Sequence, residues 1–416
     1  MNAPHPPENT DAPAITGLGL VTPLGASAWN TFAALLAGKT TADRLDELAL
    51  APEDADSTAH ALLRRDATTL ARATASCAVA AGTATDPACV LAEQAAREAL
   101  RETPPGEPLD LYLGASKGAV LQLVDVRDER RPRAFADMLA SGGPHAMLSE
   151  HLARRFPIRH RHSFTAACAS SLIALDAARR DVRDGRCARA LVVTSEAALH
   201  PVFVRSYQRL GVLAPSEPIG SYRGMPLDER REGFTLCECA AAVRIERDAP
   251  PGAPRLVGSG VGTQPDDLLR APADMGTLTR LVRAALPTNA EVSAIHPHAT
   301  GTPDHDEREL QAVARSLDPN ARDVPVYAVK GAIGHGLGSA GLVSLVIACL
   351  AGRAKRLPPM PWLSQPVAPP PPLAIHPGGT PIGPGLQVIC SAGFGGHSAV
   401  ATIDVPSRAP AGKSGR

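Results

Sequence analysis

The stretch Phe164-Thr-Ala-Ala-Cys-Ala-Ser-Ser-Leu-Ile-Ala-Leu175 places one cysteine, Cys168, between a strand-like and a helix-like segment. A β-prone run, His162 to Ala166, precedes the thiol, and apolar residues at helical spacing follow it from Leu172 onwards. A thiol at the start of a helix sees the positive end of the helix dipole, which lowers its pKa and favours the thiolate. Small neighbouring side chains leave room for a substrate. We interpret Cys168 as a nucleophile, with a buried core thiol as the alternative.

A first histidine motif, His298-Ala-Thr-Gly-Thr302, follows the apolar strand-like run that begins at Val292. Polar residues at the carboxyl end of a strand in an open α/β sheet usually face a ligand crevice. The hydroxyls of Thr300 and Thr302 are suited to an amide-bearing arm. The alternative is a turn stabilised by local side-chain hydrogen bonds.

A second motif, Lys330-Gly-Ala-Ile-Gly-His335, lies between a strand-like run and the helical pattern Leu337 to Leu350. We expect His335 to open that helix, where the positive helix terminus keeps its imidazole neutral. The backbone N–H groups of Gly393-Phe-Gly-Gly396 can form part of an oxyanion hole. One cysteine with two glycine-flanked histidines is a plausible set for acyl transfer through a thioester.

The composition restricts the class of protein. The 416 residues are 44% hydrophobic and only 3% aromatic, and the 42 basic residues balance the 42 acidic ones. The zero net charge gives no support for nucleic-acid binding. The eight scattered cysteines suggest reduced thiols, and Cys237-Glu-Cys239 lacks nearby partners for a metal site. Without a signal-peptide pattern or a long uninterrupted apolar run, we expect a soluble cytoplasmic protein with no membrane partner.

Strand-like and helix-like segments alternate on both sides of the proline-rich stretch Pro250 to Pro254. This order predicts an α/β fold with mostly parallel sheets covered by helices, built as two similar halves. We place the halves at 13–252 and 253–406, with disordered tails at 1–12 and 407–416. The proline- and glycine-rich segment 357–384 is expected to be a long loop.

The motifs together resemble the β-ketoacyl-[acyl carrier protein] synthase family, the condensing enzymes of fatty acid and polyketide synthesis, over about 14–405. The matching segments are Ile15–Gly25, Thr165–Ser170, Pro226–Phe234, His298–Asp306 with Glu309, Lys330–Gly341 and Gly393–Gly396. The resemblance implies a thiolase-like fold of two related βαβ halves in an α-β-α-β-α arrangement, working as a homodimer or as a heterodimer with a related ketosynthase subunit.

The resemblance also implies a reaction, a decarboxylative Claisen condensation of an acyl group on Cys168 with malonyl carrier protein. His298 and His335 would promote decarboxylation, and Lys330 would order the site. The amides of Cys168 and Phe394 would form the oxyanion hole, with the Phe394 ring as a gate.

The substrates would arrive on an acyl carrier protein. Thr300 and Thr302 would hold its phosphopantetheine arm, and no metal or bound organic cofactor would be needed.

Several positions depart from the family pattern. Cys237 and Cys239 replace glycines of a Gly-Glu-Gly run, His397 follows the last glycine turn in place of threonine, and Ser344 replaces a glutamate that many fatty-acid members carry. These departures favour a specialised secondary-metabolite synthase over the housekeeping enzyme. Two alternatives stay open: a non-catalytic partner like a chain-length factor, and a thiolase that uses coenzyme A.

Overall fold

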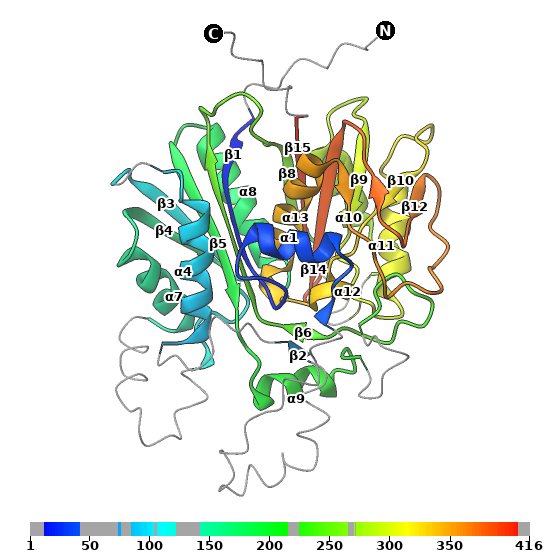
Figure 1. The fold of residues 1–416 in the computed structure, drawn as a ribbon, viewed down its shortest axis with the longest axis horizontal. Helices are drawn as coiled ribbons and strands as arrows, with labels where there is room; N and C mark the ends of the chain where they lie inside the picture. Colours follow the sequence, from blue (N-terminus) through cyan, green and yellow to red (C-terminus); the bar gives the residue numbers. More distant parts are fainter. Residues whose placement is uncertain are drawn as a thin grey trace, which may run out of the picture.

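The computed structural model describes residues 12–41, 74–75, 85–103, 106–121, 142–214, 224–264, 270 and 272–406. Within these residues most strands form one large mixed sheet of 11 strands, two separate pairs of short strands form 2-stranded sheets, and helices lie between and outside the two halves of the large sheet (Figure 1). The predicted tails fall outside the described residues except for Ala12, which is buried. Most of a helix that we expect over 119–140 also falls outside them.

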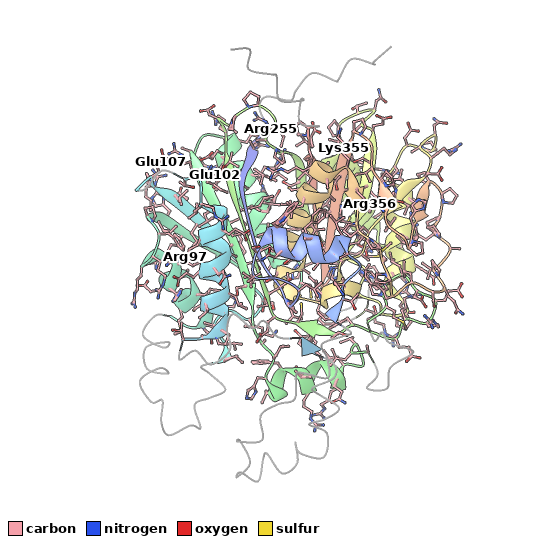
Figure 2. The ribbon with its side chains drawn as sticks, in the orientation of Figure 1. Arg97, Glu102, Glu107, Arg255, Lys355 and Arg356 are labelled. Atoms are coloured by element: carbon pink, nitrogen blue, oxygen red, sulfur yellow. The ribbon has the colours of Figure 1, made fainter. Side chains whose placement is uncertain are left out.

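The strands repeat one spatial order in both halves of the chain. In the first half the order is β4-β3-β5-β7-β1, and in the second it is β10-β9-β14-β15-β8. Counted along the chain, both read third, second, fourth, fifth, first, so the predicted duplication is present in the topology. The halves meet where Ala14 of β1 pairs with Arg255 of β8, a residue labelled in Figure 2. The strands are β1 Ala14–Val21, β3 Leu109–Gly114, β4 Ile158–Phe164, β5 Arg189–Glu196, β7 Cys239–Glu246, β8 Arg255–Thr263, β9 Val292–His296, β10 Val324–Val326, β14 Leu386–Gly393 and β15 His397–Asp404.

Two helices lie between the half-sheets. α8 (Ser170–Arg183) and α13 (Ala340–Ala354) each contact strands of both halves (Figure 1). The outer face of the first half-sheet carries α4 (Pro87–Ala99) and α7 (Pro144–Ala153), and that of the second carries α10 (Gly276–Ala285) and α11 (His305–Ala314). This is the predicted α-β-α-β-α layering. The other helices are α1 Ala28–Leu36, α9 Pro201–Arg209 and α12 Lys330–Ile333.

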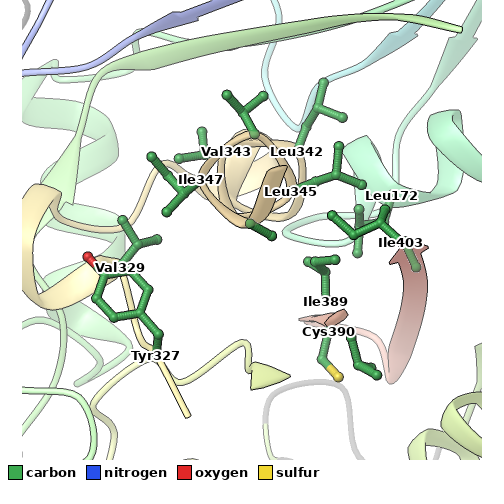
Figure 3. Close-up of a cluster of buried hydrophobic side chains, with 14 of the residues drawn as sticks. Leu172, Tyr327, Val329, Leu342, Val343, Leu345, Ile347, Ile389, Cys390 and Ile403 are labelled. Atoms are coloured by element: carbon green, nitrogen blue, oxygen red, sulfur yellow. The ribbon is translucent and has the colours of Figure 1, made fainter. Parts of the chain in front are cut away.

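The central helix α13 is apolar on every side because it is surrounded by protein. Leu342, Val343, Leu345 and Ile347 point outward in different directions toward neighbours from both halves (Figure 3). By length and hydropathy alone, 337–354 passes as a membrane span, with a mean hydropathy of 1.7, although we expected this run to be too short. Of that window, 78% is buried inside the protein, which accounts for its composition.

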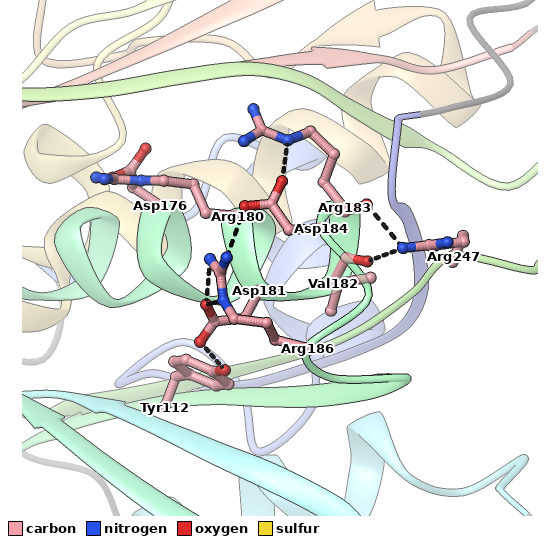
Figure 4. Close-up of polar contacts among 9 residues, drawn as sticks. All are labelled: Tyr112, Asp176, Arg180, Asp181, Val182, Arg183, Asp184, Arg186 and Arg247. Carbon is pink, nitrogen blue, oxygen red and sulfur yellow. Dashed lines mark hydrogen bonds and ion pairs between the residues drawn. The ribbon is translucent and has the colours of Figure 1, made fainter.

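Polar contacts fasten the carboxyl end of α8 (Figure 4). Tyr112 of β3 donates a 2.5 Å hydrogen bond to Asp181, which also accepts from Arg186 at 2.7 Å. Arg247 donates to the carbonyls of Val182 and Arg183 at 3.1 and 2.7 Å, where a cation meets the negative end of the helix. The far end of the helix that follows Cys168 is therefore fixed to the first half-sheet.

Two predicted boundaries in the second half are wrong. The helix expected from His335 begins at Ala340, because Gly334 adopts φ 90° and separates α12 from a 3₁₀ turn, η4 (Leu337–Ser339). The predicted loop 357–384 contains β12 (Leu373–Ile375), which adds an edge strand parallel to β10. Shorter strands are β2 Thr74–Ala75, β6 Leu236–Cys237, β11 Arg356–Leu357 and β13 Thr380–Pro381.

Candidate active site

Cys168 lies in the tight turn between β4 and α8. Ala167 before it adopts φ 47°, a left-handed conformation that costs energy for a residue with a Cβ. Ser170 holds this turn, since its Oγ accepts from the Ala166 N–H at 2.9 Å and donates to the Ala167 carbonyl at 2.7 Å. The Oγ of Ser391 donates to the Cys168 carbonyl at 2.7 Å. The strained turn is thus held from both halves of the chain.

The thiol is less acidic than the sequence suggested. Burial raises the pKa of Cys168 to about 12, and the nearby Lys330 cation only partly opposes this. We expected the helix dipole to lower this pKa, but the shift is in the other direction, because Cys168 is 9% exposed and its thiolate would lose hydration. A protonated thiol needs a base within reach to become a nucleophile.

The structure brings Cys168, His298 and His335 together. The sulfur and one ring nitrogen of each histidine all lie within 4.8 Å of one another. The two imidazole rings have centroids 5.2 Å apart at an interplanar angle of 77°. The sequence separates Cys168 from both histidines by more than a hundred positions, and the paired half-sheets place the three residues at one point.

Both histidines are neutral. Burial, and then the Lys330 cation, hold the pKa of His298 and of His335 well below the usual 6.5. Among the described residues, neither Nδ1 atom has a hydrogen-bond partner. A neutral imidazole carries one N–H donor and one acceptor nitrogen, so each ring can take up or donate a proton in the site.

Because these rings are neutral in the fold, acid should destabilise the protein. A histidine whose folded pKa is depressed stabilises the fold above its unfolded pKa of 6.5, and this contribution is lost as the pH falls below that value. We expect the free energy of unfolding in urea to fall between pH about 7.5 and about 5.5, and to fall less in His335→Asn. Equal falls in the two proteins would contradict this assignment.

The side chains of Lys330 and Glu309 both form hydrogen bonds with the backbone of His298. The Nζ of Lys330 donates to the His298 carbonyl, and burial lowers the pKa of this lysine while Glu309 opposes the shift. The Glu309 carboxylate accepts from the N–H groups of His298 at 2.6 Å and Ala299 at 2.7 Å, and its Oε2 lies 3.4 Å from His305 Nε2. The sequence resemblance placed Glu309 with the first histidine motif but assigned it no function. Its position on a helix just after that motif was the signal that could have identified it.

Backbone hydrogen bonds join His335 to the segment that contains Thr235 and Cys237. The His335 N–H donates to the Thr235 carbonyl at 2.6 Å, and the Cys237 N–H donates to the His335 carbonyl at 3.2 Å. Gly336 lies directly against the sulfur of Cys239, since a Cβ added there would stand 2.1 Å from it. The two cysteines that depart from the family pattern therefore pack against the backbone that carries His335.

A cavity of about 480 Å³ is lined by Cys168, His298 and His335. The predicted residues Thr300, Thr302 and Phe394 line it, and so does His397. The Oγ atoms of Thr300 and Thr302 lie 2.9 Å apart. Other lining residues that the sequence reasoning missed include Tyr207, Gln264, Arg270, Met275 and Leu278. They come from loops and helices whose sequence carries no motif, so only the fold could identify them.

The glycine turn between β14 and β15 lies beside Cys168. A Cβ on Gly393 would stand 2.8 Å from the Ala166 carbonyl oxygen and 3.1 Å from the Cys168 nitrogen. Only glycine permits this approach. The backbone N–H groups of Cys168 and Phe394 therefore come from adjoining turns, as an oxyanion hole requires.

Two family models together match most of the chain. The model described as "Beta-ketoacyl synthase, N-terminal domain" matches residues 12–250, and that for the "C-terminal domain" matches 260–363. The chain belongs to the β-ketoacyl synthase family. The matched family is the one that the motifs of the sequence resemble.

Individual family members show how far the likeness extends. The chain is 26% identical to a "Putative polyketide beta-ketoacyl synthase 1" of Streptomyces halstedii over 83% of this chain and 86% of the relative. It is 32% identical over 51% of its length to a highly reducing polyketide synthase of Penicillium expansum, of which it spans only 9%.

A solved type II polyketide synthase ketosynthase, bound to a hexaketide and in complex with its acyl-carrier protein, superposes with a TM-score of 0.76. It shares 20% identity, and the match covers 95% of this chain and 99% of that one.

Proposed function

We propose that this β-ketoacyl synthase catalyses the decarboxylative Claisen condensation of a Cys168-bound acyl group with malonyl carrier protein, in a fatty-acid-like or polyketide secondary-metabolite pathway. The observation that carries the proposal is the placing of Cys168, His298 and His335 within 4.8 Å of one another at the base of one cavity. The polyketide relatives support the pathway class.

In the acylation step, a neutral imidazole accepts the proton of the Cys168 thiol as the sulfur attacks the thioester carbonyl of the donor. The N–H groups of Cys168 and Phe394 stabilise the oxyanion of the tetrahedral intermediate. The intermediate collapses with loss of the carrier thiolate, which takes up the proton. The acyl group then remains on Cys168 as a new thioester, and the Phe394 ring closes over it.

In the condensation step, the malonyl thioester loses CO₂ and leaves an enolate. Its oxygen accepts hydrogen bonds from His298 and His335, which need to be neutral with an N–H directed at it. The enolate carbon attacks the Cys168 thioester, and the sulfur leaves as the β-ketoacyl product forms. Lys330 acts through the His298 carbonyl and stabilises negative charge electrostatically.

The residues that line the cavity support a proposal for how the substrates are delivered. Thr300 and Thr302 present hydroxyls that can bind the amides of a phosphopantetheine arm, so we propose an acyl carrier protein as partner. The likeness to a ketosynthase in complex with its acyl-carrier protein supports this. We further propose a cytoplasmic homodimer or heterodimer with a related ketosynthase subunit, with no resident metal or organic cofactor, since the residues named supply the nucleophile, the base and the oxyanion donors.

The test is acylation followed by intact-mass measurement. Incubation with an acyl carrier donor should add one acyl group to the wild-type protein and none to Cys168→Ala, while the matched control Cys349→Ala, which removes a buried thiol of α13, should still be acylated. An unmodified wild-type protein would overturn the proposal. β-Ketoacyl product from the purified chain alone would exclude the alternative of a non-catalytic partner, and product only with coenzyme A substrates would favour a thiolase.

A further inference from the structure

Glu196, the last residue of β5, is a buried carboxyl group that the steps above do not use. Its side chain has no exposed surface, and across the sheet it pairs with Cys239 of β7. One oxygen accepts a hydrogen bond from the Ser116 N–H and packs on Gly338 of η4, where an added Cβ would lie 2.5 Å from it. Among the described residues the other oxygen, Oε2, has no hydrogen-bond partner.

The same face of β5 holds η4 at a second point. Side chains two positions apart on a strand point the same way, so Thr194 and Glu196 face η4 together. The Oγ1 of Thr194 lies 2.9 Å from the Oγ of Ser339, and it also donates to the Gly114 carbonyl. η4 begins two residues after His335, and Ser116 follows the strand that pairs with the nucleophile strand β4.

We propose that Glu196 is a positioning residue, which joins Ser116 of the first half to Gly338 of the second and thereby holds the His335 turn against Cys168. The inference rests on the proposed function of that site. A carboxyl group suits this junction because one oxygen can accept from two backbone N–H groups, and both the Ser116 and the Gly338 N–H groups contribute to its electrostatics.

Glu196 also influences the thiol through its charge. Burial raises the pKa of Glu196 to about 7, so its charge changes near neutral pH. The other titratable groups around it are Lys117, Cys168 and Tyr207, and the Lys117 ammonium lies 5.7 Å from the centre of the Tyr207 ring. A carboxylate here raises the pKa of Cys168, whereas Lys117 and Lys330 lower it.

Two substitutions separate the positioning from the charge. Glu196→Gln keeps an oxygen in the place of Oε1 while it removes the charge and replaces Oε2 by an amide nitrogen, whereas Glu196→Ala removes the contact itself. We expect Glu196→Ala to lower kcat for condensation by about a hundredfold at an unchanged KM for the carrier substrates, because a displaced catalytic group costs rate rather than binding. Glu196→Gln should stay within about threefold of wild type.

The second readout is the rate at which iodoacetamide alkylates Cys168, followed by peptide mass spectrometry. Near pH 8, where wild-type Glu196 is ionised, Cys168 of Glu196→Gln should react roughly threefold faster than in the wild type, and near pH 5.5 the rates should be equal. The control is Glu98→Gln, which alters a carboxylate that accepts from the Leu20 and Ala28 N–H groups and should leave both profiles unchanged.

The alkylation comparison tests the charge coupling without the condensation assay, whereas the positioning role is tested by kcat. Equal alkylation of wild type and Glu196→Gln at both pH values would refute the charge coupling. Full kcat in a folded Glu196→Ala would refute the positioning role. If the wild type is not acylated at all, the proposed function fails, yet the alkylation comparison still tests the coupling between Glu196 and Cys168.

Discussion

Replacement of Glu309 by alanine is expected to abolish condensation and to lower the free energy of unfolding by about 3–5 kcal/mol. The carboxylate is fully buried, and it accepts from the N–H groups of His298 and Ala299. Burial alone would raise the pKa of Glu309, but the hydrogen bonds from His305 and the backbone hold it below its usual value. The Glu309 carboxylate is therefore a buried anion that accepts hydrogen bonds from, or pairs with, several buried groups.

Its loss leaves those donors without a counter-charge. Lys330 is a buried cation whose largest favourable electrostatic partner is Glu309, and His305 loses its ion pair with it. Ala299 adopts φ 31°, a conformation that the bond to Glu309 helps to hold. Without the carboxylate the His298 turn can relax, and the ring leaves its place beside Cys168. Glu309→Gln should be milder, because its amide oxygen replaces one of the two acceptors.

Urea unfolding and the condensation assay check this expectation together. The matched control is Glu307→Ala on the same helix, where the side chain is 62% exposed and pairs with Arg231 at 2.7 Å. Arg231 is itself buried, but it also donates to the Asp228 and Pro303 carbonyls, so this variant should lose far less than Glu309→Ala. If Glu309→Ala matched Glu307→Ala in both measurements, the supporting role of Glu309 would be wrong.

The sequence was sufficient to predict where the reactive residues meet. Cys168, His298 and Lys330 each follow the end of a strand, and glycines flank the histidine motifs, so the motifs were visible one by one. The repeated order of strands and helices then predicted a duplicated α/β fold. β9 and β10 are neighbouring strands, so His298 and Lys330 come together beyond their carboxyl ends. Cys168 follows β4 at the opposite end of the sheet, and it joins them because the two half-sheets pack on α8 and α13.

Properties that depend on tertiary contacts, such as pKa shifts and the pairing of short strands, could not be predicted from these motifs. The direction of the Cys168 pKa shift depends on how much of the thiol is buried, which no local pattern shows. Glu196 reads as an ordinary polar residue after an apolar run, yet it lies between two halves that the sequence separates. The sequence did not predict β12, because its proline-rich surroundings do not favour a strand. Pairing with β10 stabilises the strand there.

Gly336→Ala is the second change with a large expected effect, and Cys239→Gly should rescue it. The added Cβ would stand 2.1 Å from the Cys239 sulfur, which is closer than any non-bonded contact allows. Cys239 is fully buried in β7, so its side chain has little room to move away. We expect Gly336→Ala to destabilise the fold by about 3 kcal/mol through overpacking, and to displace His335 next to it.

The double variant Gly336→Ala/Cys239→Gly distinguishes this contact from a general effect on the turn. Removing the sulfur makes room for the added methyl group, so the double variant should recover most of the stability and the condensation rate that Gly336→Ala loses. The two residues are in contact, so their effects should not add. Cys237→Gly serves as the comparison, since the Cys237 sulfur would stand 3.6 Å from the same Cβ and its removal should not rescue Gly336→Ala. Rescue by neither cysteine variant would refute the contact with Cys239, and equal rescue by both would show that the lost space is not specific to the Cys239 sulfur.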